Sequence, residues 1–182
     1  MVLETTRLLL KSPSEVTGTV VRNYYWQNRD FLKEFSPVRE AEFYTDEYQS
    51  RQLEEQRHLW QAGTGFRFYI CRKAAPEEVI GSLALNNVVR GAFHSCFLGY
   101  QLDEEHTRQG YMTEAVNRMV EFAFQELNLH RIEANIIPRN IPSRALAEKC
   151  GFQREGLSPK YLKINGVWED HIHYVIRNLD ME

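Results

Sequence analysis

The spacing of apolar residues changes near residue 64, and the change separates a helical region from a region of strands. Residues 7–11 are predicted to form a short strand that ends at a Ser-Pro-Ser turn. Residues 16–35 have helical spacing, with a break expected near Asn28. Thr45 can cap a second helix, and Gly63 suits the left-handed residue that ends it. The first third of the chain is therefore predicted to be one strand followed by helices.

The next region alternates between apolar and more polar positions, which is the period of a strand. Phe66, Phe68 and Ile70 share one face of a strand that is predicted to be half-buried. A turn at residues 75–78 precedes an expected strand over 79–89, and Arg90-Gly91 leads into another over 95–102. Three successive strands joined by turns predict an antiparallel meander.

The clearest helix in the chain follows this meander. Apolar residues at positions 112, 115, 116, 119, 120 and 123 form one stripe on a helix that starts near Gly110. A strand is predicted over 131–137, and Pro142 suits the first turn of a short helix that ends at Gly151. Strands over 152–164 and 167–176 join through Asn165-Gly166, a strong two-residue hairpin signal. With no repeat or linker, the pattern predicts a single α+β domain over residues 1–182.

Composition and charge narrow the functional classes. Lys and Arg number 22 and Asp and Glu 25, so the formal charge is −3 and the pI about 6.1. The basic footprint of a nucleic-acid-binding protein is missing, so Trp26, Trp60 and Trp168 are expected in the core. The longest uncharged stretch, residues 91–102, is well short of the ~20 residues that span a bilayer. With no secretory signal and three scattered cysteines, we expect a cytoplasmic protein with reduced thiols, without nucleic-acid or membrane partners.

The junction between the strand ending at Leu102 and the helix starting near Gly110 carries the most informative chemistry. Such a loop points unpaired backbone N–H groups outward at the positive end of the helix dipole. Both features favour the binding of a phosphate group. Gly110 lets the backbone approach a bulky anion, and Arg108 adds a cation. Neither a Walker loop nor a dinucleotide fingerprint is present. From this loop alone, an ordinary helix start remains the simpler interpretation.

Four separated motifs resemble the GNAT N-acetyltransferases. Residues 98–102 (LGYQL) with 108–115 (RQGYMTEA) are similar to the acyl-CoA-binding motif of that family. Residues 130–135 (HRIEAN), 140–143 (NIPS) and 148–152 (EKCGF) resemble the second half of its domain. Residues 87–94 and 161–171 resemble the RimJ/RimL-type branch, which acetylates N-termini of ribosomal proteins. The resemblance implies a mixed, mostly antiparallel twisted sheet of about seven strands, with helices on both faces and a splay between the fourth and fifth strands.

The resemblance also implies acetyl-CoA as the cosubstrate and gives individual residues a role. Backbone groups at the end of the splayed strand would bind the pantetheine arm, and backbone N–H groups of the loop would hold the pyrophosphate. Asn140 would hydrogen-bond the pantetheine, and Ser143 would lie near the thioester sulfur. The implied cofactor-binding residues are Gln101, Leu102, Arg108, Gln109, Gly110, Met112, Thr113, Asn140 and Ser143.

The sequence departs from the family pattern at several of these places. Met112 stands where relatives carry glycine or alanine, which predicts a narrower approach for the pyrophosphate. Ala147 occupies the position of a tyrosine that protonates the leaving thiolate in many relatives, so Ser143 is the expected catalytic acid. Phe97 and Asn135 stand where relatives carry a carboxylate base.

The missing carboxylate base bears on the acceptor. At pH 7 deprotonation costs about 1.4 kcal/mol for an α-amine of pKa about 8, and about 5 kcal/mol for a lysine amine of pKa about 10.4. A site without an obvious base therefore suits an N-terminal α-amine, which water or Glu133 would deprotonate. Glu133 alternates with Asn135 on one strand and so faces the same way. The other interpretation of Glu133 is a surface or structural carboxylate.

The resulting hypothesis is an acetyl-CoA-dependent N-acetyltransferase that acts on the N-terminus of a protein, such as a ribosomal protein, by direct attack in a ternary complex. One alternative acceptor is a small amine such as a polyamine, amino sugar or drug. Another alternative is a non-catalytic CoA-binding or ribosome-associated module. His171 and His173 share a strand face but lack a third ligand at a fitting spacing, so no metal site is expected. The assembly is expected to be a monomer or a homodimer.

Overall fold

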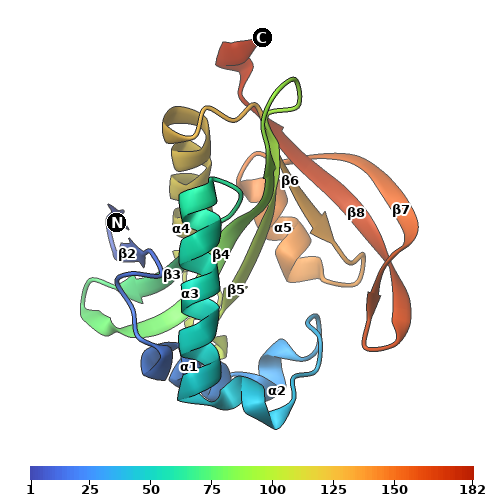
Figure 1. Ribbon diagram of the computed structural model, residues 1–182. Coiled ribbons are helices and arrows are strands. Elements are labelled where there is room, and N and C mark those ends of the chain that lie inside the picture. The colour runs from blue at the N-terminus through green and yellow to red at the C-terminus, as the bar shows by residue number, and fades with distance from the viewer.

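The computed structural model describes residues 1–182, and all eight strands belong to one sheet (Figure 1). The strands are β1 (Val2–Glu4), β2 (Leu8–Lys11), β3 (Phe66–Arg72), β4 (Ala75–Val89), β5 (Ser95–Leu102), β6 (Arg131–Ile136), β7 (Gln153–Ile164) and β8 (Val167–Arg177). The helices are α1 (Gly18–Gln27), α2 (Arg29–Leu32), α3 (Asp46–Ala62), α4 (Tyr111–Glu121) and α5 (Ile141–Lys149). Short helical turns occur at η1 (Ala41–Tyr44), η2 (Glu104–His106), η3 (Phe122–Glu126) and η4 (Leu179–Met181).

The sheet is mixed and mostly antiparallel, as the sequence predicts. Its order is β1-β2-β3-β4-β5-β6-β8-β7, and only β5 and β6 run parallel. The expected meander is confirmed as β3, β4 and β5. The strand beyond the expected seven is β1, which pairs with β2 over three positions. Three residues are too few for alternation to be recognised in the sequence, so β1 was not expected.

The sheet opens between β5 and β6. Parallel pairing covers only three positions, the last being Phe97 opposite Glu133. From Leu98 to Leu102 β5 pairs with β4 on one side and with no strand on the other. Counted without β1, this is the predicted splay between the fourth and fifth strands. The splay leaves the end of β5 with an unpaired edge.

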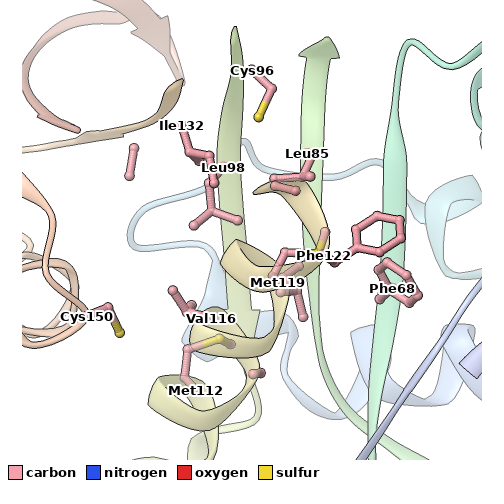
Figure 2. Packing of buried hydrophobic residues seen from close by; sticks show 14 of the residues in the cluster. Phe68, Leu85, Cys96, Leu98, Met112, Val116, Met119, Phe122, Ile132 and Cys150 are labelled. Carbon is pink, nitrogen blue, oxygen red and sulfur yellow. The ribbon is translucent and has the colours of Figure 1, made fainter. Parts of the chain in front are cut away.

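Helices cover both faces of the sheet. The larger core cluster has 27 buried residues and joins α4 and α5 to one face. Met112, Val116, Met119 and Phe122 project from the α4 segment toward the strands, which confirms the predicted apolar stripe (Figure 2). The smaller cluster packs α1 and α3 on the other face, and α3 stands in front of the strands in Figure 1.

Burial on both faces corrects the prediction that the strand at 66–71 is half-buried. Phe68 points into the larger cluster, whereas Tyr69 and Cys71 are buried in the smaller one. The period of two is confirmed, but the second face of the strand is covered by the smaller cluster instead of solvent. The expectation of three core tryptophans was also wrong, because Trp26 is 50% exposed and Trp168 56%.

The predicted helix boundaries agree closely with the structure. Helix α1 ends before Asn28, at the expected break, and α2 follows. The Thr45 hydroxyl caps α3 by accepting from the Tyr48 N–H (3.2 Å), and Gly63 ends α3 with φ of 70°. The Asn165-Gly166 turn has positive φ at both residues, 50° and 84°, as its hairpin type requires.

One predicted turn is wrong. Residues 75–78 lie inside β4, whose first residue Ala75 pairs with Arg72 of β3. Register shifts on either side of Cys71 absorb the extra residues as a bulge, so proline does not interrupt the strand. The three cysteines are free and buried, as expected. No helix is both long and apolar enough to cross a membrane.

Candidate active site

The loop after β5 delivers an open helix N-terminus to the edge of the splay. Gly110 precedes α4 with φ of 81°, and no side chain caps the first turn of that helix. The first N–H groups of α4 have no intrahelical partner, so they are available to an anion. Arg108 adopts φ of 60° and is exposed beside them. The geometry therefore fits the phosphate-binding role predicted for this loop.

The N-terminal segment holds this loop in place, which the sequence did not reveal. The Arg7 side chain donates through Nε to Glu114 (2.7 Å) in the first turn of α4, and through Nη1 to the Gln109 carbonyl (3.0 Å). The Arg7 backbone N–H donates to the same carboxylate at 2.7 Å, and the Thr5 hydroxyl donates to it as well. The guanidinium also lies 4.4 Å from the centre of the Tyr111 ring. More than 100 residues separate these partners, so no local pattern could indicate the contact.

A second brace connects the loop to the break between α1 and α2. The buried Asn28 amide donates to Asp103 Oδ2 (2.7 Å), and its oxygen accepts from the Glu104 N–H (3.0 Å). Burial favours a raised pKa for Asp103, but hydrogen bonds from Asn28, His106 and the Glu105 N–H outweigh it and hold the pKa below its usual range. The Asp103 carboxylate therefore stays charged at neutral pH and fixes both segments.

Met112 does not narrow the approach to the loop, contrary to the expectation from the family pattern. Its side chain is 7% exposed and belongs to the larger core cluster (Figure 2). Because position 112 faces the sheet, a methionine there adds packing without filling the space in front of the N–H groups. The Gln109 side chain likewise turns back, donating to the Glu105 carbonyl at 2.8 Å.

Ser143 and Tyr100 meet where α5 approaches the splay. Asn140 caps α5 by accepting from the Ser143 N–H (3.2 Å), which leaves its NH₂ group as a donor for a ligand. The Tyr100 hydroxyl lies 2.9 Å from Ser143 Oγ and 3.2 Å from the Ser143 carbonyl. Burial raises the pKa of Tyr100 to about 12, so this hydroxyl keeps its hydrogen at neutral pH. The sequence shows Tyr100 only as part of a motif, because its side-chain contact joins two elements 43 residues apart.

The opposite face of the splay is partly covered by the segment after α2. Gln101 Nε2 donates to Ser36 Oγ (3.1 Å), so its side chain faces this segment while its backbone remains at the splay. Asn165 in the β7–β8 hairpin donates to the Ser36 carbonyl (3.2 Å) and accepts from the Val38 N–H (2.7 Å). A hollow of about 240 Å³ adjoins Gln101 between this segment and α1.

Glu133 is not a free carboxylate. One of its oxygens accepts from Arg131 (2.9 Å) and the other lies 2.9 Å from His173 Nδ1. The second histidine of this strand, His171, is buried and contacts the Glu169 carbonyl through Nδ1 (3.1 Å). No group of three His, Cys, Asp or Glu side chains is placed to hold a metal ion.

The comparisons with known proteins identify the family. The model of the acetyltransferase (GNAT) domain matches residues 7–153. The chain belongs to the GNAT acetyltransferase family. GNAT enzymes take their acetyl group from acetyl-CoA, which is therefore the cosubstrate of this N-acetyltransferase.

Individual relatives of this GNAT protein agree with that assignment. A probable N-acetyltransferase of Bacillus subtilis, YjcK, is 44% identical over 156 residues, 86% of each chain. The [ribosomal protein uS5]-alanine N-acetyltransferase of Escherichia coli is 35% identical over 171 residues, 93% of this chain and 87% of the relative. The crystal structure of the ribosomal-protein-S5-alanine acetyltransferase of Vibrio fischeri superposes with a TM-score of 0.92 at 34% identity, covering 100% and 99% of the two chains. The RimJ/RimL-type resemblance is thus confirmed.

Within this GNAT fold, the predicted cofactor-binding residues gather at one place. The unpaired edge of β5 includes Gln101 and Leu102, and the loop that continues to Thr113 comes directly after it. The start of α5 brings Asn140 and Ser143 to the same edge. Glu133 lies across the opening on β6. Three further residues hold this site in place through their contacts with the loop after β5 and with Ser143: Arg7, Asn28 and Tyr100. The sequence did not indicate that they would do so.

Proposed function

We propose that this acetyltransferase acetylates the N-terminal α-amine of a protein, and that a ribosomal protein is its acceptor. The names of the Escherichia coli and Vibrio fischeri relatives support an N-terminal alanine of ribosomal protein S5 as the kind of acceptor to test first. Such an acceptor would place the reaction in the cytoplasm, where ribosomal proteins and acetyl-CoA occur together.

The charge of the hollow beside Gln101 carries the choice of acceptor class. Arg29, Lys33 and Arg39 contribute three cations to its lining, against the single carboxylate of Asp30. A polyamine carries several ammonium groups and needs carboxylates to neutralise them, so this lining would repel a polyamine more strongly than the single α-ammonium of a peptide N-terminus.

The residues at the splay would bind the cosubstrate. The unpaired edge of β5 at Gln101 and Leu102 offers backbone donors and acceptors to the amides of the pantetheine arm, and the Asn140 NH₂ group adds a donor. The N–H groups from Arg108 to Thr113 would hold the pyrophosphate, with the helix dipole adding positive potential.

Ser143 would serve as the catalytic acid. As the thioester breaks, negative charge develops on sulfur, and a hydroxyl placed beside it stabilises that charge by donating its hydrogen. The Tyr100 hydroxyl is within hydrogen-bond distance of both the Ser143 carbonyl and Ser143 Oγ. When Tyr100 donates to Oγ, the hydrogen of Ser143 is free to point at the sulfur. Tyr100 is therefore a positioning residue for the acid, supplied by β5 in place of a tyrosine at position 147.

The proposal is tested by thiol release from acetyl-CoA with three acceptors. The first is a peptide with the N-terminal sequence of ribosomal protein S5 and a free alanine amine, the second is the same peptide blocked at its N-terminus with an internal lysine, and the third is spermidine. We expect release with the free N-terminus alone. Release with spermidine but not with the free peptide would replace the proposed acceptor by a small amine, and tight acetyl-CoA binding without any release would indicate a non-catalytic module.

A further inference from the structure

Three side chains surround His173 on the side of the sheet away from α4 and α5, and with it they form a cluster of four. His173 Nδ1 lies 2.9 Å from Glu133 Oε1 and also contacts the Asn135 side-chain oxygen. His173 Nε2 lies 2.6 Å from the Ser158 hydroxyl. The members come from β6, β7 and β8, and the carboxylate and imidazole are about four-fifths buried, with 15% and 18% of their side-chain surface exposed.

The contacts fix where the imidazole carries its hydrogen. Both partners of Nδ1, Glu133 and Asn135, present acceptor oxygens, so Nδ1 is the protonated nitrogen. The lone pair is then on Nε2, and it accepts the hydrogen of the Ser158 hydroxyl. Carboxylate, imidazole and hydroxyl in this order form the arrangement in which the imidazole acts as the base that takes the hydrogen of the hydroxyl.

The cluster borders the opening of the sheet. Glu133 is the last residue of β6 to pair with β5, and Asn135 lies two positions beyond it, opposite His173 of β8. Across the opening, Gly99 faces the same side as Phe97, and a Cβ at Gly99 would meet only the Asn86 amide, at 3.8 Å. The absence of a side chain at position 99 leaves space for an acceptor between the two strands.

We propose that Ser158 and His173 together remove the proton from the acceptor α-ammonium, an inference that rests on the proposed function. The N–H bond of the ammonium breaks and its electron pair stays on nitrogen as the attacking lone pair. Its proton passes to Ser158 Oγ while the Ser158 hydrogen moves to His173 Nε2, and the resulting imidazolium later releases that proton to water. Glu133 is the positioning residue, because its carboxylate fixes the imidazole and stabilises the imidazolium.

The charged groups around His173 are compatible with this step. Glu133 shares its charge with Arg131, which also binds Glu155 of β7 at 2.7 Å, so the three groups contribute one net negative charge. Tyr161 packs the edge of its ring against His173, with ring centres 5.1 Å apart. The ring of His171 lies 5.5 Å from the same tyrosine ring, measured between ring centres. An imidazolium at position 173 therefore finds a net carboxylate charge and no adjacent unpaired cation.

The pH profile separates this role from a structural one. A base is needed while the acceptor amine is protonated, and an α-amine of pKa about 8 is largely neutral above pH 9. Loss of the base therefore costs most of its rate near pH 7 and little at high pH. A variant that merely disturbed the packing of β8 would lose activity equally at both ends of the range.

The experiment measures kcat/KM for the free-alanine peptide from pH 6.5 to 9.5 in His173→Gln, Ser158→Ala, Ser158→Thr and Glu133→Gln. We expect His173→Gln and Ser158→Ala to lose about 100-fold at pH 7 and less than about 10-fold at pH 9.5. Ser158→Thr keeps a hydroxyl and should recover most of the rate. His130→Gln, which removes a surface imidazole paired with Glu182, is the matched control and should leave the profile unchanged.

Unchanged rates in Ser158→Ala, or losses that are the same at every pH, would overturn the proposal. Ser158 lies on the edge strand β7 and is partly exposed, so its variants are expected to fold. They therefore test the proposal even if a substitution at His173 prevents folding. Acetyl-CoA affinity, measured by calorimetry, should stay within about 2-fold in all variants. The wild-type protein keeps the two proposals apart, since wild type that does not acetylate the peptide contradicts the proposed function, whereas active wild type with indifferent variants contradicts only the role of Ser158 and His173.

Discussion

At the scale of single residues, the contact between Tyr100 and Ser143 predicts a graded loss of activity. Ser143→Ala removes the proposed donor to sulfur and should lower kcat about 100-fold. Tyr100→Phe removes only the hydroxyl that orients Ser143 and should lower kcat about 10-fold. Both side chains act through the hydrogen of the Ser143 hydroxyl, so the double variant should be no slower than Ser143→Ala alone. Steady-state kinetics with the peptide would measure the three rates. Acetyl-CoA affinity should change by less than about 2-fold.

Tyr69→Phe is the control for this pair. Tyr69 is also buried and its hydroxyl also has one side-chain partner, Gln56 at 2.9 Å, but it lies in the smaller cluster under α1 and α3. Its loss should lower Tm without lowering kcat. If the effects of Tyr100→Phe and Ser143→Ala multiply in the double variant, the two hydroxyls act independently and Tyr100 does not position the acid.

At the residue scale, a sequence indicates a role where a motif carries that role, but not where the role depends on a contact between distant residues. Asn140 and Ser143 are predicted site residues because their positions belong to a recognisable pattern, and the structure brings both to the splay. Glu133 was found through strand alternation, but alternation gives a face and not a partner. His173 was considered only as a metal ligand, because its contact with Glu133 depends on the pairing of β6 with β8, 40 residues away.

At the scale of elements, a substitution at the start of α4 should weaken binding of acetyl-CoA. This effect can be separated from the loss of folding stability that the same substitution causes. Gly110 has φ of 81°, where a side chain is strained, and its added Cβ would lie 3.3 Å from the Arg7 guanidinium. Gly63 at the end of α3 has φ of 70° and open space around it. Alanine at either position should cost about 1–2 kcal/mol of folding free energy, a fall of a few degrees in Tm.

Only Gly110→Ala should weaken acetyl-CoA binding, by about 10-fold in calorimetry, because it displaces the N–H groups and the Arg7 contact at the proposed pyrophosphate site. Gly63→Ala is the matched control, because it introduces similar backbone strain at a position far from the proposed pyrophosphate site. Equal affinities in the two variants would show that the loop geometry at Gly110 does not contribute to binding.

Helices, strands and turns were predicted more accurately than any other feature of this structure, because the sequence patterns that indicate them are local. The stripe of α4, the Thr45 cap, the break at Asn28 and the Asn165-Gly166 hairpin all depend on residues within a few positions of one another. The misplaced turn at 75–78 failed for the opposite reason. A bulge beside Cys71 lets β4 begin early, and a bulge depends on the partner strand.

At the scale of the whole molecule, the site is assembled by braces between distant segments. The N-terminal hairpin reaches α4 through Arg7 and Glu114, and the break between α1 and α2 reaches the end of β5 through Asn28 and Asp103. The loop that would hold pyrophosphate is thus fixed at both ends by residues far away in sequence. Folding stability and cosubstrate binding should therefore respond together when a brace is weakened.

Acid should weaken the Glu114 brace. Burial favours a raised pKa for Glu114, but hydrogen bonds from Thr5 and Arg7 outweigh it and lower the pKa below its ordinary value of 4.5. A carboxyl with a lowered folded-state pKa stabilises the fold above its unfolded pKa, and that stability is lost as pH falls through the folded-state value. Wild type should thus have a higher Tm than Glu114→Gln at pH 7, and the difference should shrink below about pH 4.5.

Thermal melts of both proteins at pH 7, 5, 4 and 3 would measure this difference. Glu121→Gln is the control on the same helix, because Glu121 makes only an exposed 3.7 Å pair with Arg118 and such pairs contribute little. Its Tm should follow wild type at every pH. A Tm difference for Glu114→Gln that stays constant down to pH 3 would mean that the Glu114 charge does not stabilise the junction. In that case the hydrogen bonds from Thr5 and Arg7 would hold the loop whether or not their acceptor is ionised.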